Sequence, residues 1–382
     1  MPMLLIQGGS VHDGINREAK VLDILVKDGK ISKIGTKISA RGARVVDARG
    51  LQVYPGFIDA HSHLGLDGYG IGYEGADYNE LNDIISPQLR GIDGFKPMQS
   101  HLRQAALAGV TTVNTGPGSA DVLGGTFTAV KTVGRRVDDM VVRMETAMKC
   151  AFGENPKRVY RDKGDSSRMT TAAKLREMLF KAREYAARKQ LAQEDPAKAP
   201  GFDMKLEALL PVINRQMPLK AHAHTTEDMF TALRIAREFE VDITLEHVTE
   251  GHLIAQELAE AGVPLCVGPS LTTASKFELR NRTFETPAIL ARAGCQVSIT
   301  TDAPVIPQEY LSLCAALAVK SGMDPFDALQ AITINAARHA GIADKVGSLE
   351  IGKDADIVLI DGDCFDVAAR VVQVFILGKE VE

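Results

Sequence analysis

The pattern of hydrophobic and polar positions is similar at the two ends of the chain and different in its middle. Over residues 3–53, short apolar runs are separated by turn residues, and the Asp-Gly pair at 28–29 lies between DILVK and KISKIG. An Asp-Gly pair between two alternating runs predicts a β-hairpin. The last forty residues show the same pattern in DADIVLIDGD and VVQVFILGKEVE. We therefore expect β structure at both ends of the chain.

Between these ends, short apolar strands alternate with helical segments. One such segment has its apolar residues three and four positions apart, at Leu175, Met178, Leu179, Ala182 and Ala186. Repeated strand-then-helix units over this length predict an α/β protein whose parallel sheet closes into a (β/α)8 TIM-type barrel. The expected strands cover 110–115, 218–224, 241–247, 263–268 and 295–302, and TFTAVKT and TAMKCAF are less regular candidates between 116 and 152.

The two patterns predict two domains. We expect residues 55–343 to form the barrel, because the repeated units fall within this range. Residues 1–54 and 344–382 are then expected to pair as a small composite β-sandwich, which the barrel interrupts in the sequence. This arrangement would bring the two ends of the chain together.

Composition restricts the class of protein. With 45% hydrophobic and 24% charged residues and a net charge of −5, the chain is typical of a globular protein and favours neither nucleic acid nor an anionic membrane as partner. The first residues, MPMLLIQGGSVHDG, lack the basic region and long apolar segment of a signal peptide. The five cysteines are widely spaced and odd in number, so we expect reduced core residues in a cytoplasmic protein.

Two of the nine histidines, His61 and His63, are one residue apart in the stretch PGFIDAHSHLG. Side chains alternate along a strand, so both imidazoles are expected on one face, about 6–7 Å apart at the backbone. At that separation both rings reach a single metal ion at about 2.0–2.1 Å. An isolated pair of this kind is equally compatible with two ordinary core or surface histidines.

The remaining expected strands decide between these alternatives. Almost every one ends in a residue of a metal-ligand type, and the active site of such a barrel lies at the C-terminal ends of its strands. A chance distribution would place these residues at both strand ends and on the outer helices. After His61 and His63 the residues are Lys149, His222, His224, His247 and Asp302.

With these residues the chain resembles the amidohydrolase superfamily over nearly its whole length. The resemblance rests on GFIDAHSH, HAH, LEH, the Thr-Asp pair at 301–302 and the tail GSLEIGKDADIVLID. The branch containing imidazolonepropionases and certain dipeptidases is the most similar. The resemblance implies a metal-dependent hydrolase of a C–N bond.

The resemblance also implies a ligand set. His61 and His63 would bind a buried metal, His222 and His247 a second one, and Lys149 would bridge the two as a carboxylated lysine. An ammonium group has no acceptor, so Lys149 must lose its proton and react with CO2 before it can bind. Glu145 and Glu154 flank it as alternative bridges, and an ordinary ion-paired lysine is the other interpretation.

Asp302 would bind the first metal and serve as the proton shuttle, which gives it a catalytic role. His224 is expected to bind substrate or its reacting carbonyl, or else to support a neighbouring ligand. In the loop 268–286, Arg280 is our candidate for a substrate carboxylate, against solvated surface charge as the alternative. We expect Glu246 to point to the opposite face of its strand from His247, which favours a barrel-exterior or structural role over catalysis.

Three functions follow for a small-molecule substrate. The first is hydrolysis of a dipeptide, acylamino acid or cyclic amide by metal-activated water, with one or two divalent ions, zinc being the best match to nitrogen and oxygen ligands. The second is a mononuclear deaminase or imidazolonepropionase-like enzyme; those relatives carry glutamate three residues after the strand-five histidine, where this chain has Thr225. The third is a non-catalytic binding homologue. Homo-oligomerisation is left open.

Overall fold

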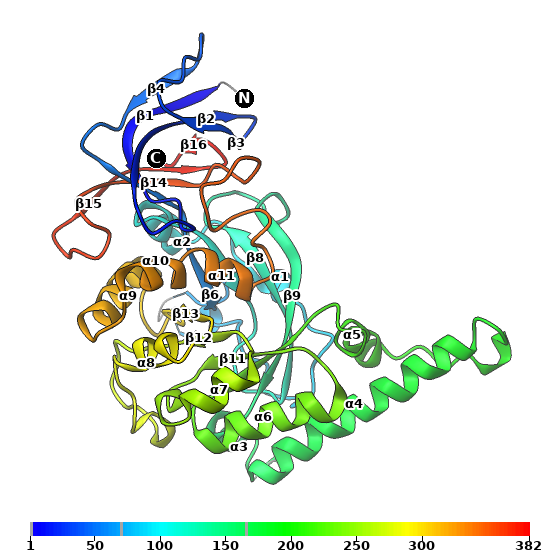
Figure 1. Ribbon diagram of the computed structural model, residues 1–382. Coiled ribbons are helices and arrows are strands. Elements are labelled where there is room, and N and C mark those ends of the chain that lie inside the picture. Colours follow the sequence, from blue (N-terminus) through cyan, green and yellow to red (C-terminus); the bar gives the residue numbers. More distant parts are fainter. Residues whose placement is uncertain (1–2, 69–71, 165–166) are drawn as a thin grey trace.

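The structure of the protein is a computed structural model that describes residues 3–68, 72–164 and 167–382. Two sheets organise the chain. Figure 1 shows the smaller one, built from both ends of the chain, above the larger one and its helices. Within the described ranges, no helix is long and apolar enough to cross a membrane.

The sheet formed by the two ends joins strands that are far apart in the sequence. Its strands are β1 (Leu4–Val11), β2 (Lys20–Lys27), β3 (Lys30–Gly35), β4 (Arg44–Asp47), β5 (Gln52–Pro55), β14 (Ile357–Asp361), β15 (Arg370–Ile376) and β16 (Lys379–Glu380). They form one connected sheet in the order β16-β15-β14-β5-β1-β2-β3, with β4 paired to β1. Both ends of the chain therefore contribute to one sheet, as expected, and its description as a sandwich stays a prediction. The domain boundaries at 54/55 and 343/344 stay a prediction.

The expected hairpin lies at one edge of this sheet. Asp28 and Gly29 join β2 to β3 and have φ of 50° and 77°, the left-handed values that a two-residue hairpin turn requires. Glycine reaches this conformation without strain, and aspartate tolerates it better than most residues. The sequence prediction is confirmed here.

The second sheet is mostly closed. Its strands are β6 (Phe57–Ser62), β7 (Val110–Thr115), β8 (Leu123–Lys131), β9 (Val141–Ala151), β10 (Leu219–Ala223), β11 (Ile243–His247), β12 (Leu265–Val267) and β13 (Val297–Ile299). They follow one another in sequence order around the sheet. Hydrogen bonds after β13, from Thr301 N to Asp59 Oδ2 (2.9 Å) and from His63 N to Ala303 O (2.8 Å), join its last strand to its first.

One part of this sheet departs from the predicted strand-helix alternation. β8 runs antiparallel to both β7 and β9, whereas the other neighbouring strands are parallel. Antiparallel neighbours need only a short connection, and parallel neighbours need a crossover. Residues 116–122 and 132–140 accordingly contain no α-helix, and the prediction of a regular (β/α)8 repeat is wrong for this segment.

Helices surround the larger sheet. They are α1 (Gly91–Gly94), α2 (Ser100–Leu107), α3 (Glu154–Val159), α4 (Arg168–Leu191), α5 (Met204–Ile213), α6 (Thr226–Phe239), α7 (Ala255–Ala261), α8 (Thr286–Arg292), α9 (Leu311–Lys320), α10 (Pro325–Ala331) and α11 (Ile334–His339). Short 3₁₀ helices are η1 (Tyr73–Gly75), η2 (Val137–Asp139), η3 (Pro196–Lys198), η4 (Gly251–Leu253), η5 (Phe277–Leu279) and η6 (Gln308–Tyr310). The predicted helical spacing at Leu175, Met178, Leu179 and Ala182 marks the buried face of α4.

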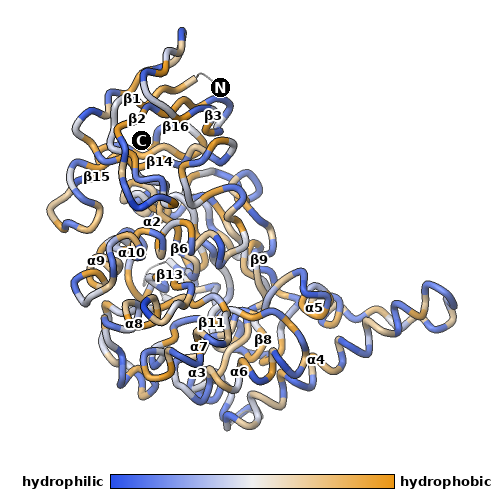
Figure 2. The backbone as a smooth tube through the Cα atoms, viewed as in Figure 1, coloured by the Kyte–Doolittle hydropathy of each residue, from blue (hydrophilic) through white to orange (hydrophobic). Residues whose placement is uncertain are grey.

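Helix α4 is the longest helix and has only a short buried stripe. It projects from the barrel and returns through α5, which packs beside it (Figure 1). Figure 2 shows hydrophilic and hydrophobic residues alternating along the projecting part of α4. The projection separates β9 from β10, so two neighbouring strands of the sheet are far apart in the sequence.

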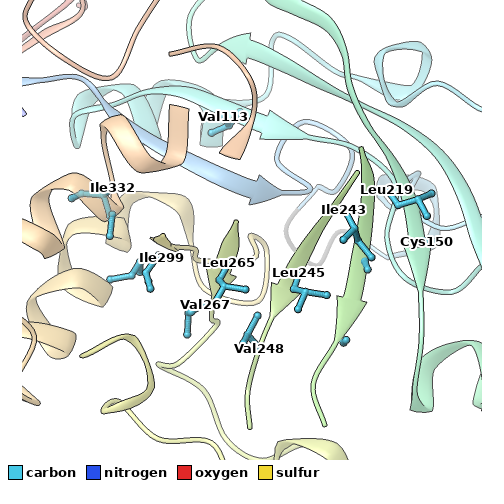
Figure 3. Close-up of a cluster of buried hydrophobic side chains, with 14 of the residues drawn as sticks. Val113, Cys150, Leu219, Ile243, Leu245, Val248, Leu265, Val267, Ile299 and Ile332 are labelled. Carbon is cyan, nitrogen blue, oxygen red and sulfur yellow. The ribbon is translucent and has the colours of Figure 1, made fainter. Parts of the chain in front are cut away.

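Apolar side chains on one face of the larger sheet pack against the helices. Leu245, Leu265 and Val297 are in-register partners on β11, β12 and β13 and therefore point to the same side. Figure 3 shows Leu245 and Leu265 in this cluster with Leu219 and Ile299 from the flanking strands. The opposite face of these strands is left for polar residues.

A buried ion cluster joins the two sheets. Lys131, at the end of β8, lies 2.9 Å from Asp354 Oδ2 and 2.6 Å from Asp356 Oδ2, both just before β14, and its side chain is 5% exposed. Burial alone would raise the pKa of Asp354, but the ammonium groups of Lys131 and Lys30 lower it below its ordinary value. The cluster fixes the C-terminal strands to the barrel.

We predict that Lys131→Met lowers the free energy of unfolding by about 3–5 kcal/mol, because it leaves two buried carboxylates without their main counter-ion. Urea unfolding of the parent and the variant measures the difference. Arg17→Met is the control, since the Arg17–Asp324 pair is 62% and 41% exposed and should change stability by no more than about 1 kcal/mol. Equal effects of the two substitutions would contradict the prediction.

Candidate metal centre

Seven of the predicted site residues meet at the C-terminal ends of the barrel strands. His61, Lys149, His222 and His247 lie on β6, β9, β10 and β11. Of the other three, His63 and His224 follow directly after β6 and β10, and Asp302 lies three residues after the end of β13. All are buried except Asp302, whose side chain is 14% exposed. Residues separated by up to 241 positions are thus brought to one end of one sheet.

His61, His63 and Asp302 form the first group. Asp302 Oδ1 lies 3.3 Å from His63 Nε2 and 3.6 Å from His61 Nε2, so both imidazoles face the same side, as strand alternation predicted. The Nδ1 atom of His63 donates to Gly116 O at 2.7 Å, and that of His61 donates to Glu246 Oε2 at 2.9 Å. Each neutral ring therefore turns the lone pair of its Nε2 toward the carboxylate of Asp302.

The donor atoms of the first group are of the kind that a cation binds. Two imidazole lone pairs and a carboxylate oxygen converge, and Asp302 Oδ1 makes no hydrogen bond to any residue that the structure describes. Although burial would raise it, the pKa of Asp302 is well below its ordinary value because His247 and His63 lie beside it. Burial also lowers the pKa of His61 well below its ordinary value. Such a set of electron-pair donors fits a divalent metal.

His222, His224 and His247 form the second group, with ligand atoms within 4.8 Å of one another. His247 Nδ1 donates to Gly268 O at 2.8 Å, which leaves Nε2 as the acceptor. Neither ring nitrogen of His222 makes a hydrogen bond within the described part of the chain. Burial lowers the pKa of His222 and His224 well below the ordinary value and that of His247 to about 4. His247 also belongs to a group with His61 and Asp302, so the two groups adjoin.

Lys149 lies beside the first group and is fully buried. Its Nζ is 3.4 Å from His61 Nε2, and burial lowers its pKa to about 8, which favours the neutral amine that carboxylation requires. The two alternatives lie elsewhere. Glu145 is 3.5 Å from Arg90 and about 40% exposed, and Glu154 is the first residue of α3, beyond the end of the strand. Of these three residues, Lys149 is the one that lies beside a histidine of the first group.

Two site residues have unusual backbone conformations. His247 has φ of 72° and Asp302 has φ of 52°, in the left-handed region that side-chain-bearing residues rarely adopt. The turn at His247 breaks the alternation of β11, so His247 and its neighbour Glu246 both reach the barrel interior. Glu246 is in register with His222. The barrel-exterior position predicted for Glu246 is wrong for this reason, and the structural role is the alternative that agrees with its buried position.

Glu246 holds a network beneath the first group. Its Oε1 is 2.8 Å from His339 Nε2 and 2.6 Å from Thr244 Oγ1, and its Oε2 is 2.8 Å from Lys220 Nζ in addition to the bond from His61. Burial alone would raise the pKa of Glu246, but His339 and Lys220 lower it well below its ordinary value. This carboxylate fixes the tautomer of His61, as the outer partner of a metal-binding histidine does.

A cavity of about 350 Å³ opens above the two groups and is lined by His63, His224 and Asp302 together with two cationic residues, Lys276 and Arg158. A larger cavity, of about 690 Å³, lies at the opposite ends of the strands, and neither ligand group lines it. Of these two cavities, the smaller one is therefore the one that residues of both ligand groups line.

Arg280 does not line this cavity. Its guanidinium pairs with Glu250 Oε1 at 3.1 Å and stacks on the ring of Phe277, 4.3 Å from the centroid. Lys276, in the same loop, does line the cavity and lies 2.6 Å from Glu278 Oε1. The pattern of cationic residues in the loop gave no signal that would separate Lys276 from Arg280.

Comparisons with known proteins agree with this geometry. The chain matches the amidohydrolase family over residues 52–381. It is similar to the amidohydrolase tasK of Hapsidospora irregularis (29% identity over 93% of this chain and 39% of that longer protein) and to an imidazolonepropionase of Symbiobacterium thermophilum (26%, over 94% and 88%). A crystal structure of an amidohydrolase from Thermotoga maritima MSB8 has a TM-score of 0.96 and 39% identity over 99% of both chains.

We predict that Glu246→Gln destabilises the metal-free protein by about 3–5 kcal/mol, because the buried ammonium of Lys220 loses its counter-charge. Urea unfolding in the presence of a chelator measures this loss. The matched control is the double variant Glu246→Gln/Lys220→Met, which removes the unpaired charge and should regain at least half of the loss. No recovery in the double variant would show that the ion pair is not the origin of the effect.

Proposed function

The chain belongs to the amidohydrolase family, whose members hydrolyse C–N bonds, and we propose that it cleaves a dipeptide, an acylamino acid or a cyclic amide with divalent metal ions. One observation carries the proposal: two groups of metal-ligand side chains adjoin at His247 on the floor of a single small cavity. We also interpret the mostly closed sheet as a TIM-type barrel, in which the active site lies at the C-terminal ends of the strands.

His61, His63 and Asp302 would hold one metal, and His222 and His247 a second, with carboxylated Lys149 between them. Neutral imidazoles with oxygen ligands suit Zn²⁺. When bound, the metal would act as a Lewis acid and lower the pKa of water. The residues of the chain would supply orientation and proton transfer.

Asp302 is the residue we propose for proton transfer. It is the only member of the two ligand groups that is partly exposed, and it lies at the cavity. A carboxylate in this place can take a proton from the attacking water and pass it to the leaving nitrogen. His224 would contact the reacting carbonyl, because its Nδ1 is held 2.7 Å from Thr249 Oγ1 and its ring lines the cavity.

The substrate is proposed to carry a carboxylate. The cavity presents the cationic side chains of Lys276 and Arg158, and Arg280 is occupied by Glu250. An ammonium and a guanidinium both bind carboxylates through charge-assisted hydrogen bonds. A cavity of about 350 Å³ suits a small ligand, near the lower end of the usual range.

The mononuclear deaminase or imidazolonepropionase-like activity is the second candidate, favoured by the similarity over 94% of the chain to an imidazolonepropionase. The residue at position 225 is evidence against this second candidate. Thr225 lies at the start of α6, where it donates to Asp228 Oδ2 at 2.9 Å instead of offering a carboxylate to the site. A non-catalytic role is less well supported, since every ligand type is retained. A cytoplasmic location stays a prediction.

We predict that the purified protein contains up to two divalent ions per chain and that Lys149→Ala contains one, because the second ion loses its bridge. Elemental analysis measures both values. Hydrolysis of dipeptides should cease after chelation and return with Zn²⁺. Full activity after chelation would overturn the proposed function, whereas one ion with full activity in the parent would favour the second candidate. Two tightly bound ions in Lys149→Ala would place the bridge elsewhere.

We predict that Asp302→Asn lowers kcat by at least about 100-fold, since positioned acid–base groups contribute roughly 10²–10⁴ in rate. KM should change much less, because the contact is made chiefly in the transition state. Steady-state kinetics at matched metal content separates the two quantities. A variant within a few fold of the parent would remove Asp302 from proton transfer and leave His224 as the next candidate.

A further inference from the structure

The loop after β12 places a carboxylate next to the second group of histidines. In this loop, η5 carries Glu278 to the histidines, and the Glu278 side chain is 1% exposed. A carboxylate removed from water in this way needs compensating partners. The ligand set that the family resemblance implies includes no residue of this loop.

The two oxygens of Glu278 face different surroundings. Oε2 accepts a hydrogen bond from the backbone N–H of Glu154 at 2.9 Å. It also lies against Gly153, where a Cβ atom would be 2.6 Å from this oxygen. Gly153 has φ of 84°, so both its conformation and its missing side chain make room for Glu278. One oxygen is therefore fixed by the main chain.

The other oxygen points at the histidines. Glu278 Oε1 is 3.7 Å from His222 Nε2 and 3.6 Å from His224 Nε2. These separations are too long for hydrogen bonds. They are close to the distance of about 3.4 Å between two ligand atoms of a tetrahedral zinc ion with bonds of about 2.0–2.2 Å. The ring nitrogens of His222 bond to no described residue. A cation between His222 and the carboxylate would give this imidazole a partner.

We propose that Glu278 is a ligand of the second metal ion, which it would bind through Oε1 together with His222. The inference rests on the proposed metal centre and extends it by a residue from a loop. Lys276 Nζ lies 2.6 Å from the same oxygen and places a positive charge beside it. A metal ion bound at Oε1 would take over that charge and leave Lys276 available for the substrate.

The test compares Glu278→Gln with Lys276→Met, because both remove the Lys276–Glu278 ion pair and only the first removes the carboxylate. Metal-free parent and variants are titrated with Zn²⁺ and with Co²⁺, and binding is followed by elemental analysis and by the visible spectrum of the cobalt forms. Glu278→Gln should keep one ion and bind the second at least about tenfold more weakly, with a changed cobalt spectrum. Lys276→Met should bind the second ion at least as tightly as the parent.

Gly153→Ala is a second variant that displaces the carboxylate without changing its charge. It should also weaken the second ion, and circular dichroism shows whether each variant is folded. Equal weakening by Glu278→Gln and Lys276→Met, or two ions bound by Glu278→Gln with the parent's affinity and spectrum, would overturn the role of Glu278. A parent that takes up one ion or none would instead overturn the proposed two-metal centre, and Glu278 as its ligand with it.

Discussion

A neutral imidazole accepts at one nitrogen only when the other nitrogen carries the proton, and the candidate metal centre depends on this constraint. At His63 and His247 the proton is fixed by main-chain carbonyl oxygens, and at His61 by Glu246. The three acceptor nitrogens are therefore set by the fold before any metal binds. The loop after β7, through Gly116, and the loop after β12, through Gly268, both contribute to the centre by holding these protons.

The sequence was sufficient for those parts of the site that follow strand periodicity. His61 and His63 share a side because β6 alternates, and strand ends collect the remaining ligand types because neighbouring parallel strands end together. The position of Glu246 could not be predicted, because the left-handed backbone at His247 breaks the alternation. Arg280 and Lys276 were indistinguishable in the sequence because the course of a long loop decides which of them meets the cavity.

In the fold, too, the features that follow from local sequence patterns were predictable and the others were not. Strands and the Asp-Gly hairpin follow from local patterns, so their existence and type were predictable. The antiparallel direction of β8 was not, because TFTAVKT has the same apolar character in either direction. What determines the direction is the length of the connections on both sides of β8, and these connections carry no periodic pattern of their own. The existence and type of the elements could thus be predicted from the sequence, whereas the way in which they are joined could not.

The pairing of β5 with β14 has a consequence for how the chain reaches its native state. One edge of β5 pairs with β1, and the other edge pairs with residues 357–360 of β14. The second edge therefore stays open until about three hundred further residues have left the ribosome. Unpaired strand edges in incomplete chains are prone to associate with one another. The barrel sequence therefore has to be synthesised while that edge is exposed, and fast local closure of the β2–β3 hairpin protects only the far side of the sheet.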